Sequence, residues 1–143
     1  MIRSYKNDDI EAVLKLWLTA SIKAHDFVDA EFWQSQVDNM RNIYLPASDI
    51  FVYQRGSKII GFYALYETTL AALFVANDAQ GQGVGKQLLS HAKSQRTRLS
   101  LCVYKENEPS IKFYMSQGFS IISEQTDKHT GHQELTMTHE PKP

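Results

Sequence analysis

Hydrophobic residues recur at intervals of three and four after a short polar start, and this period is typical of an amphipathic helix that packs on a core. The stripe consists of Ile10, Val13, Leu14, Trp17 and Leu18. Asp8 and Glu11 have the spacing of a helix N-cap and its capping-box partner. The sequence therefore predicts a helix that begins near Asp8, preceded by a short strand over residues 2–5.

A second helical pattern follows a stretch without sustained period, residues 20–28. It begins at Asp29, stops before Pro46, and has in one row Trp33, Val37, Met40 and Tyr44. Residues 50–55 and 58–66 are then rich in β-branched and aromatic residues, and Gly56-Ser57 between them suits a type II′ turn. We expect an antiparallel hairpin there.

The apolar run over residues 70–75 has no polar member, so it predicts a central strand covered on both faces. A glycine-rich turn over residues 80–85 opens a helix to about Arg96, and residues 99–103 form another buried strand. Asn107 caps a last helix that Gly118 ends at its C′ position, and strands over residues 119–123 and 134–138 complete the chain.

The predicted order is β-α-α-β-β-β-α-β-α-β-β over a single domain, residues 1–143. Only the unit from Leu70 to Val103 favours parallel pairing. The fold class is α/β (α+β): one mixed, mostly antiparallel sheet of six to seven strands flanked by about four helices.

Charge and composition narrow the function. The 143 residues include 15 Lys and Arg against 16 Asp and Glu, a net charge of −1, which argues against nucleic acid as a partner. No apolar run approaches the ~18 residues of a membrane span, and the polar start does not resemble a secretion signal. We therefore expect a cytoplasmic protein without membrane contact, in which Cys102 is a buried structural thiol.

The segment Gln80-Gly81-Gln82-Gly83-Val84-Gly85 lies between a strand and a helix. Glycines allow close backbone approach, and the N–H groups at a helix start favour a phosphate. A glycine-rich turn without ligand is the alternative. The spacing does not fit a dinucleotide fingerprint, and a Walker loop would need a hydroxyl after Lys86. The five histidines have no metal-ligand spacing, so no metal is expected.

Two motifs together resemble the GNAT superfamily of acetyl-CoA-dependent N-acetyltransferases. Gln80, Gly83 and Gly85 match its pyrophosphate-binding pattern Q/R-x-x-G-x-G/A. The segment from Asn107 to Phe119 is similar to its N-x-x-A/S-x-x-F/L-Y-x-x-x-G-F pattern. The order of elements is also similar over the whole chain, and several short stretches resemble small bacterial members that acetylate protein lysines.

The resemblance implies that acetyl-CoA is bound by the central strand and the loop that follows it. The implied residues are Leu73, Phe74, Val75, Gln80, Gly81, Gln82, Gly83, Val84, Gly85, Lys86, Asn107 and Tyr114. Asn107 is then a helix cap, a pantetheine ligand or both. Tyr114 would be the general acid that protonates the leaving thiolate; the alternative is an aromatic residue on a buried helix face.

The reaction also needs a group that accepts a proton from the amine, because an ammonium with a pKa of about 10.4 must become neutral before it attacks. Some superfamily members use a glutamate on the central strand, but residues 68–72 contain no carboxylate. Glu67 and His25 are the candidates for this group, each with a purely structural alternative. By resemblance, His25, Phe27 and Trp33 would line the acceptor site.

The acceptor implied by the resemblance is the side-chain amine of protein lysine. A small amine (a polyamine, an amino acid or an antibiotic) and a non-catalytic acetyl-CoA-binding module are the alternatives, while acetylation of aminoacyl-tRNA conflicts with the charge balance. Residues 81–117 contain 6 basic and 2 acidic residues, which suits a cofactor with phosphates. We expect a monomer or a weak homodimer.

Overall fold

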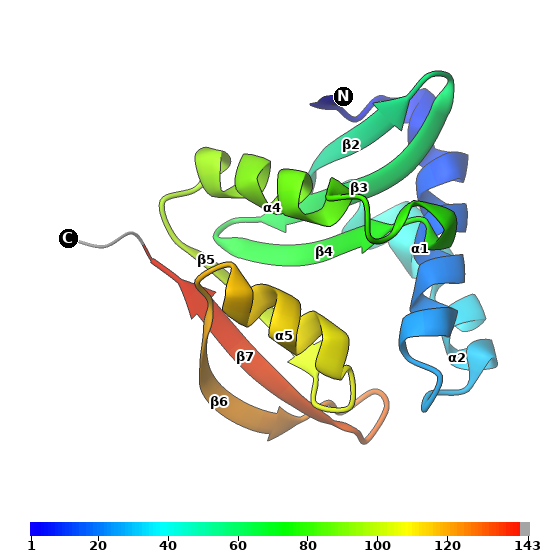
Figure 1. Ribbon diagram of the computed structural model, residues 1–143. Coiled ribbons are helices and arrows are strands. Elements are labelled where there is room, and N and C mark those ends of the chain that lie inside the picture. Colours follow the sequence, from blue (N-terminus) through cyan, green and yellow to red (C-terminus); the bar gives the residue numbers. More distant parts are fainter. Residues whose placement is uncertain (141–143) are drawn as a thin grey trace.

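A computed structural model describes residues 1–140, in which seven strands form one mixed sheet (Figure 1). The strands are β1 (Ile2–Ser4), β2 (Asp49–Arg55), β3 (Lys58–Tyr66), β4 (Thr69–Val75), β5 (Leu99–Tyr104), β6 (Ser120–Thr126) and β7 (Gln133–His139). Their order is β1-β2-β3-β4-β5-β7-β6, and only β4 and β5 are parallel neighbours. The predicted element order and the single parallel pair are confirmed.

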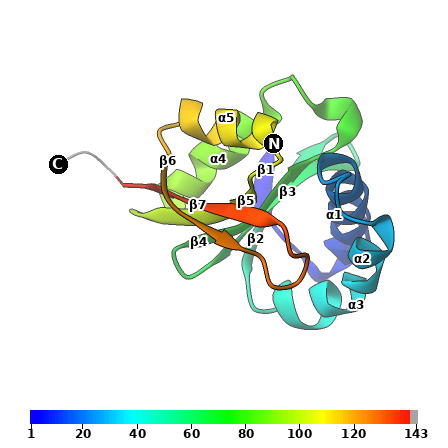
Figure 2. The same ribbon diagram turned by 90° about the horizontal axis from the view of Figure 1, so that it is seen from below.

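The helices cover the sheet from both sides. They are α1 (Ile10–Ala24), α2 (Ala30–Ser35), α3 (Val37–Asn39), α4 (Val84–Gln95) and α5 (Glu108–Ser116). Figure 2 shows α4 and α5 on one side of the sheet and α1 and α2 on the other. Among residues 1–140, no helix combines the length and apolar character that crossing a membrane requires.

Each side of the sheet has its own core, because side chains alternate along the strands. Tyr63 of β3 packs with Leu88 and Leu89 of α4, while Phe62 packs with Val13 of α1. All five residues are fully buried. The hairpin between β2 and β3 turns at Gly56, whose φ of +62° fits the predicted type II′ turn.

The strands β4 and β5 pair through one residue pair, Thr69 with Ser100, and then separate. In the pairing of β4 with β3, Ala64 faces Ala72 and Leu65 faces Leu70, so Ala71 is the extra residue of a β-bulge. The expectation that residues 70–75 are covered on both faces is therefore wrong. Only Leu70 is buried, because the gap beside β4 exposes part of the rest.

The alternation along β5 also corrects the assignment of Cys102. Leu99, Leu101 and Val103 are buried against the α4 side, whereas Cys102 points to the other side and is exposed. An apolar run predicted a strand with two buried faces, but β5 buries only one. Partial burial of the sulfur still raises the pKa of the Cys102 thiol, which favours its protonated form at neutral pH.

Three predictions for residues 8–44 are wrong in detail. The helix-start contact is made by Asp9, which accepts a hydrogen bond from the Lys6 N–H at 2.8 Å, while the Glu11 carboxylate pairs with Arg41. The helix α1 also continues through residues 20–24. The second helical pattern breaks into α2, α3 and a π-helix over Met40–Tyr44, which leaves Tyr44 exposed.

Asp9 ties β1 to α1, because the Arg3 guanidinium donates to both of its oxygens, at 2.8 and 2.9 Å. This hydrogen bonding lowers the pKa of the Asp9 carboxyl. We expect Asp9→Asn to lower the free energy of unfolding by about 2 kcal/mol at pH 7. Because the folded-state pKa is lowered, the difference from wild type should shrink as the pH falls below about 4. Chemical denaturation at pH 7 and pH 3 measures it, with the exposed Asp8→Asn as the control.

Candidate active site

Two adjoining cavities lie along β4, and one of them occupies the gap between β4 and β5. The loop cavity, of about 470 Å³, extends from the glycine-rich loop to Tyr114. The strand cavity, of about 260 Å³, extends from Tyr114 between the two strands to α1 and α2. Both are lined by Leu73, Phe74, Asn107, Ser110 and Tyr114. A ligand held along β4 therefore passes from one side of the sheet toward the other.

The glycine-rich loop adopts a backbone that only glycine takes readily. Gly81 and Gly83 have φ of +78° and +82°, and a Cβ on either would meet open space. Gly83 is the N-cap of α4, so the N–H groups of the first turn, at Val84, Gly85 and Lys86, have no partner within the helix. Together with the helix dipole, these groups form a cradle for an anion.

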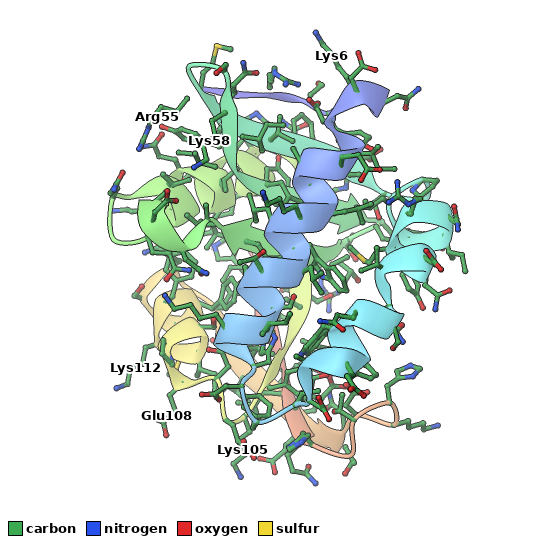
Figure 3. All side chains as sticks on the ribbon, turned by 90° about the vertical axis from the view of Figure 1, so that its right-hand side faces the viewer. Lys6, Arg55, Lys58, Lys105, Glu108 and Lys112 are labelled. Atoms are coloured by element: carbon green, nitrogen blue, oxygen red, sulfur yellow. The ribbon has the colours of Figure 1, made fainter. Side chains whose placement is uncertain are left out.

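Side chains around the loop fix its shape. The Gln80 side chain donates to the Val75 carbonyl at 3.3 Å. The Gln82 side chain accepts a hydrogen bond from Arg55 at 2.8 Å, and Figure 3 shows Arg55 and Lys58 of the β2–β3 hairpin on this edge of the molecule. Lys58 pairs with Asp78 at 3.3 Å. These contacts hold the Gln80 and Gln82 side chains, and the glycines of the loop have no side chain, so backbone groups of the loop are accessible from the cavity.

Tyr114 lies where the two cavities meet. The helix α5 brings it there, since Asn107 caps the helix by accepting from the Ser110 N–H at 3.4 Å. Tyr114 is 9 % exposed and packs on the Phe113 and Phe119 rings. Burial raises the pKa of the phenol, so the hydroxyl keeps its proton at neutral pH and is a hydrogen-bond donor.

His25 follows α1 and reaches across the gap to α5. Its Nε2 lies 3.4 Å from the Asn107 amide nitrogen. Because the Asn107 oxygen already accepts at the helix cap, its NH₂ donates to an unprotonated Nε2. Burial lowers the pKa of His25 to about 4. The imidazole is therefore neutral at pH 7, and this geometry favours a role in positioning Asn107.

Aromatic rings close the far end of the gap. Phe27 packs on Tyr104 of β5 and on His132 of the β6–β7 loop, with ring centroids 5.5 and 5.0 Å apart. His25 packs on Trp33 and Tyr104 at 5.1 Å in each case. The segment after α1 thereby joins the two halves of the separated sheet.

Three buried polar atoms at these rings have no hydrogen-bond partner within residues 1–140. They are the Ser21 hydroxyl oxygen, the His25 Nδ1 and the Trp33 indole nitrogen, and all three residues line the strand cavity. Ser21 is 0 % exposed and Trp33 8 % exposed. Since buried polar groups normally find partners, the strand cavity suits a ligand or water that forms hydrogen bonds.

Residues 46–121, more than half of the chain, match the family model described as "Acetyltransferase (GNAT) domain". The chain belongs to the GNAT acetyltransferase family. Peptidyl-lysine N-acetyltransferase YiaC of Escherichia coli is 36% identical over 123 residues, which are 85% of this chain and 84% of YiaC. This GNAT protein is therefore an acyltransferase whose acetyl donor is acetyl-CoA, as the sequence motifs predicted.

Solved GNAT structures share the fold. The solution structure of apo YjaB from Escherichia coli superposes with a TM-score of 0.85 at 27% identity, covering 97% of this chain and 96% of YjaB. A PaiA N-acetyltransferase from Thermoplasma acidophilum, solved with coenzyme A, has a TM-score of 0.81 at 18% identity and covers 99% and 98% of the two chains. The predicted fold class is confirmed.

All but one of the residues predicted to bind the cofactor line the loop cavity. Leu73, Phe74, Val75, Gln80, Gly81, Gly83, Val84, Gly85, Lys86, Asn107 and Tyr114 all line the loop cavity. Gln82 does not, because its side chain is held by Arg55. The anion cradle and the open β4 edge fit the phosphates and the amide-containing arm of acetyl-CoA.

Only some of the residues predicted for the acceptor side lie at the strand cavity. His25 and Trp33 line the strand cavity, and Phe27 packs behind His25. Glu67 lies in the turn between β3 and β4, exposed, with φ of +55°, and its carbonyl accepts from Arg96. The strands β4 and β5 are joined at that end, so the structure does not bring Glu67 to the cavities.

Glu134 of β7 is the carboxylate that the sequence analysis missed. It lies opposite Tyr104 in the β5–β7 pairing and lines the strand cavity. Its Oε1 accepts from the Gln125 amide at 3.3 Å. The alternation of Glu134, Thr136 and Thr138 with buried Leu135 and Met137 signals a polar strand face, but only the pairing of β7 with β5 places that face at the site.

The role of Gly83 can be separated from simple backbone strain. We expect Gly83→Ala to destabilise the fold by about 1 kcal/mol, because alanine disfavours positive φ, and also to weaken acetyl-CoA binding. Gly131, with φ of +76° in the β6–β7 loop, is the matched control. Gly131→Ala should cost similar stability with unchanged affinity. Thermal unfolding and calorimetric titration measure the two effects; equal affinity in both variants would contradict a cradle at Gly83.

Proposed function

We propose that this enzyme acetylates the side-chain amine of lysine residues in proteins. The shape of the strand cavity carries the proposal. At about 260 Å³ it is smaller than the roughly 300–1,000 Å³ of most small-molecule pockets, and it leads to Tyr114 between the Trp33 and Tyr104 rings and the Glu134 carboxylate. A slim, cationic side chain fits such a passage. The name of the similar YiaC, a peptidyl-lysine N-acetyltransferase, supports the same acceptor.

The loop cavity would hold acetyl-CoA, which supplies an activated thioester carbonyl. Beyond Thr69 the edge of β4 has no strand partner on the β5 side, so backbone groups of residues 73–75 are available to the pantetheine amides. The first-turn N–H groups of α4 would bind the pyrophosphate, and the Lys86 ammonium adds charge. These contacts fix the thioester beside Tyr114, and that positioning is a large part of catalysis.

Tyr114 would donate its phenolic proton to the sulfur as the carbon–sulfur bond breaks. The raised pKa means that the donor is always protonated when the substrates bind. Because a phenol of raised pKa is a weak acid, proton transfer accompanies the departure of the thiolate and does not precede it. Solvent then restores the proton once coenzyme A leaves.

Glu134 would bind the incoming ammonium. Its carboxylate is the acidic group among the residues that line the strand cavity, so it offsets the loss of hydration of the lysine charge. The ammonium must lose one proton before its nitrogen attacks the thioester. Water held by the Ser21 hydroxyl, the Trp33 indole and Glu134 would carry that proton to solvent.

The proposal is tested by incubating the protein with acetyl-CoA and peptides that contain one internal lysine. The N-terminus of these peptides is blocked, and we expect acetylation on the lysine Nε, detected by mass spectrometry. We expect little acetylation of unblocked peptides whose only amine is the α-amine, or of polyamines. Tyr114→Phe should lower kcat by about 100-fold or more while acetyl-CoA affinity changes little. Rapid acetylation of polyamines with no reaction at lysine would contradict the proposed acceptor.

The negative charge of Glu134 should affect reaction with the lysine peptide and leave the binding of acetyl-CoA unchanged. We expect Glu134→Gln to lower kcat/KM for lysine peptides by roughly 10- to 100-fold, the range for loss of a hydrogen bond to a charged group, with unchanged acetyl-CoA affinity. Glu124→Gln is the control, because Glu124 is exposed on β6 and pairs with Lys105. Steady-state kinetics decide, and equal rates for the two variants would remove Glu134 from the site.

A further inference from the structure

A third hollow, here called the apolar pocket, lies beside the strand cavity on the α1 side of the sheet. Its volume is about 550 Å³, within the range of ligand-binding pockets. Its lining includes Trp17, Ile43, Tyr44, Ala64, Ala71 and Ala72. Neither the donor nor the reacting amine uses this space in the function proposed above.

The apolar pocket has small residues on the side of the sheet and large residues on the side of the π-helix. Ala64 of β3 and Ala71 and Ala72 of β4 leave room over the sheet. Ile43 and Tyr44 of the π-helix are 54% and 51% exposed at its rim. π-Helices are rare and are frequent at functional sites. Large apolar side chains left exposed around a hollow are typical of a surface that binds another molecule.

The apolar pocket is continuous with the site of acetyl transfer. Trp17, Ala71 and Ala72 line both this pocket and the strand cavity. Ala71 is the bulged residue at which β4 turns away from regular pairing. A chain whose lysine enters the strand cavity therefore has its neighbouring residues next to the apolar pocket.

The charge of the lining decides what can bind there. None of the described residues that line the apolar pocket is charged, whereas the strand cavity has Glu134. A charged group in the apolar pocket would lose hydration without a partner. We propose that the apolar pocket binds an aliphatic or aromatic side chain that lies close to the acceptor lysine in the sequence of the target protein. This inference rests on the proposed function and adds a sequence preference to it.

Peptides with a single lysine test the preference. The lysine is flanked by glycines, and one leucine or one aspartate is placed in turn at each of the three positions before and after it. We expect leucine at one position at least to raise kcat/KM about tenfold over glycine, which is the scale of filling an apolar pocket. Aspartate at that position should give no gain.

Two variants tie the preference to the pocket. Ala47 is exposed in the lining, and Ala47→Trp should fill the space, so that the leucine advantage falls below twofold. The rate on the all-glycine peptide and the affinity for acetyl-CoA should stay within twofold of wild type. Ile43→Asp places a charge at the exposed rim and should also remove the leucine advantage. Thermal unfolding shows whether each variant is folded. If Ala47→Trp does not fold, the result with Ile43→Asp decides the test.

Equal rates on leucine and glycine peptides at every position would overturn the inference, as would a leucine preference that survives in the folded variants. The lysine function itself fails separately, if wild type binds acetyl-CoA yet acetylates no lysine peptide. Acetylation of phenethylamine in their place, lost in Ala47→Trp, would show that the apolar pocket holds a small apolar amine, and would overturn the inference as well.

Discussion

The separation of β4 from β5 is the constraint on which the site depends. A parallel ladder that begins at Thr69 and Ser100 would normally continue along both strands, but here it stops after one pair. The peptide groups that lose their partners must find others, because buried N–H and C=O groups are costly to leave unpaired. Gln80 satisfies the Val75 carbonyl. The remaining open edge is suited to a ligand that itself contains amides.

A sheet divided in this way needs a second connection between its halves. The aromatic contacts of His25 and Phe27 with Tyr104 and His132 provide it at the far end of the gap. These contacts bury His25, and that burial lowers the pKa of its imidazole to about 4. The same rings leave polar groups such as the Ser21 hydroxyl and the Trp33 indole facing the strand cavity. The residues that hold the halves together are thus also the walls along which an acceptor would pass.

Features set by residues close together in the sequence could be predicted, whereas features set by contacts between distant segments could not. The apolar stripe of α1, the Gly56 turn and the Asn107 cap are local, and the sequence predicted them correctly. The second helical pattern was only partly right, because it breaks into α2, α3 and a π-helix. The double burial of residues 70–75 was wrong because pairing beyond Thr69 depends on the partner strand and on the bulge at Ala71. The place of Glu134 depends on β7 pairing with β5, a contact between segments about 30 residues apart. No local pattern specifies either feature.

Charge along the sequence is a poorer guide to this site than charge in space. The basic excess over residues 81–117 suited a phosphate-bearing cofactor, yet three of its six cations are in ion pairs: Arg96 with Asp49, Arg98 with Glu140 and Lys105 with Glu124. Lys112 projects from α5 (Figure 3), and Lys86 lines the loop cavity. Exposed ion pairs contribute little and are screened by salt. Recognition on both sides of the gap therefore rests on groups within hydrogen-bond or van der Waals reach: loop N–H groups for the donor, and Glu134 with its aromatic neighbours for the acceptor.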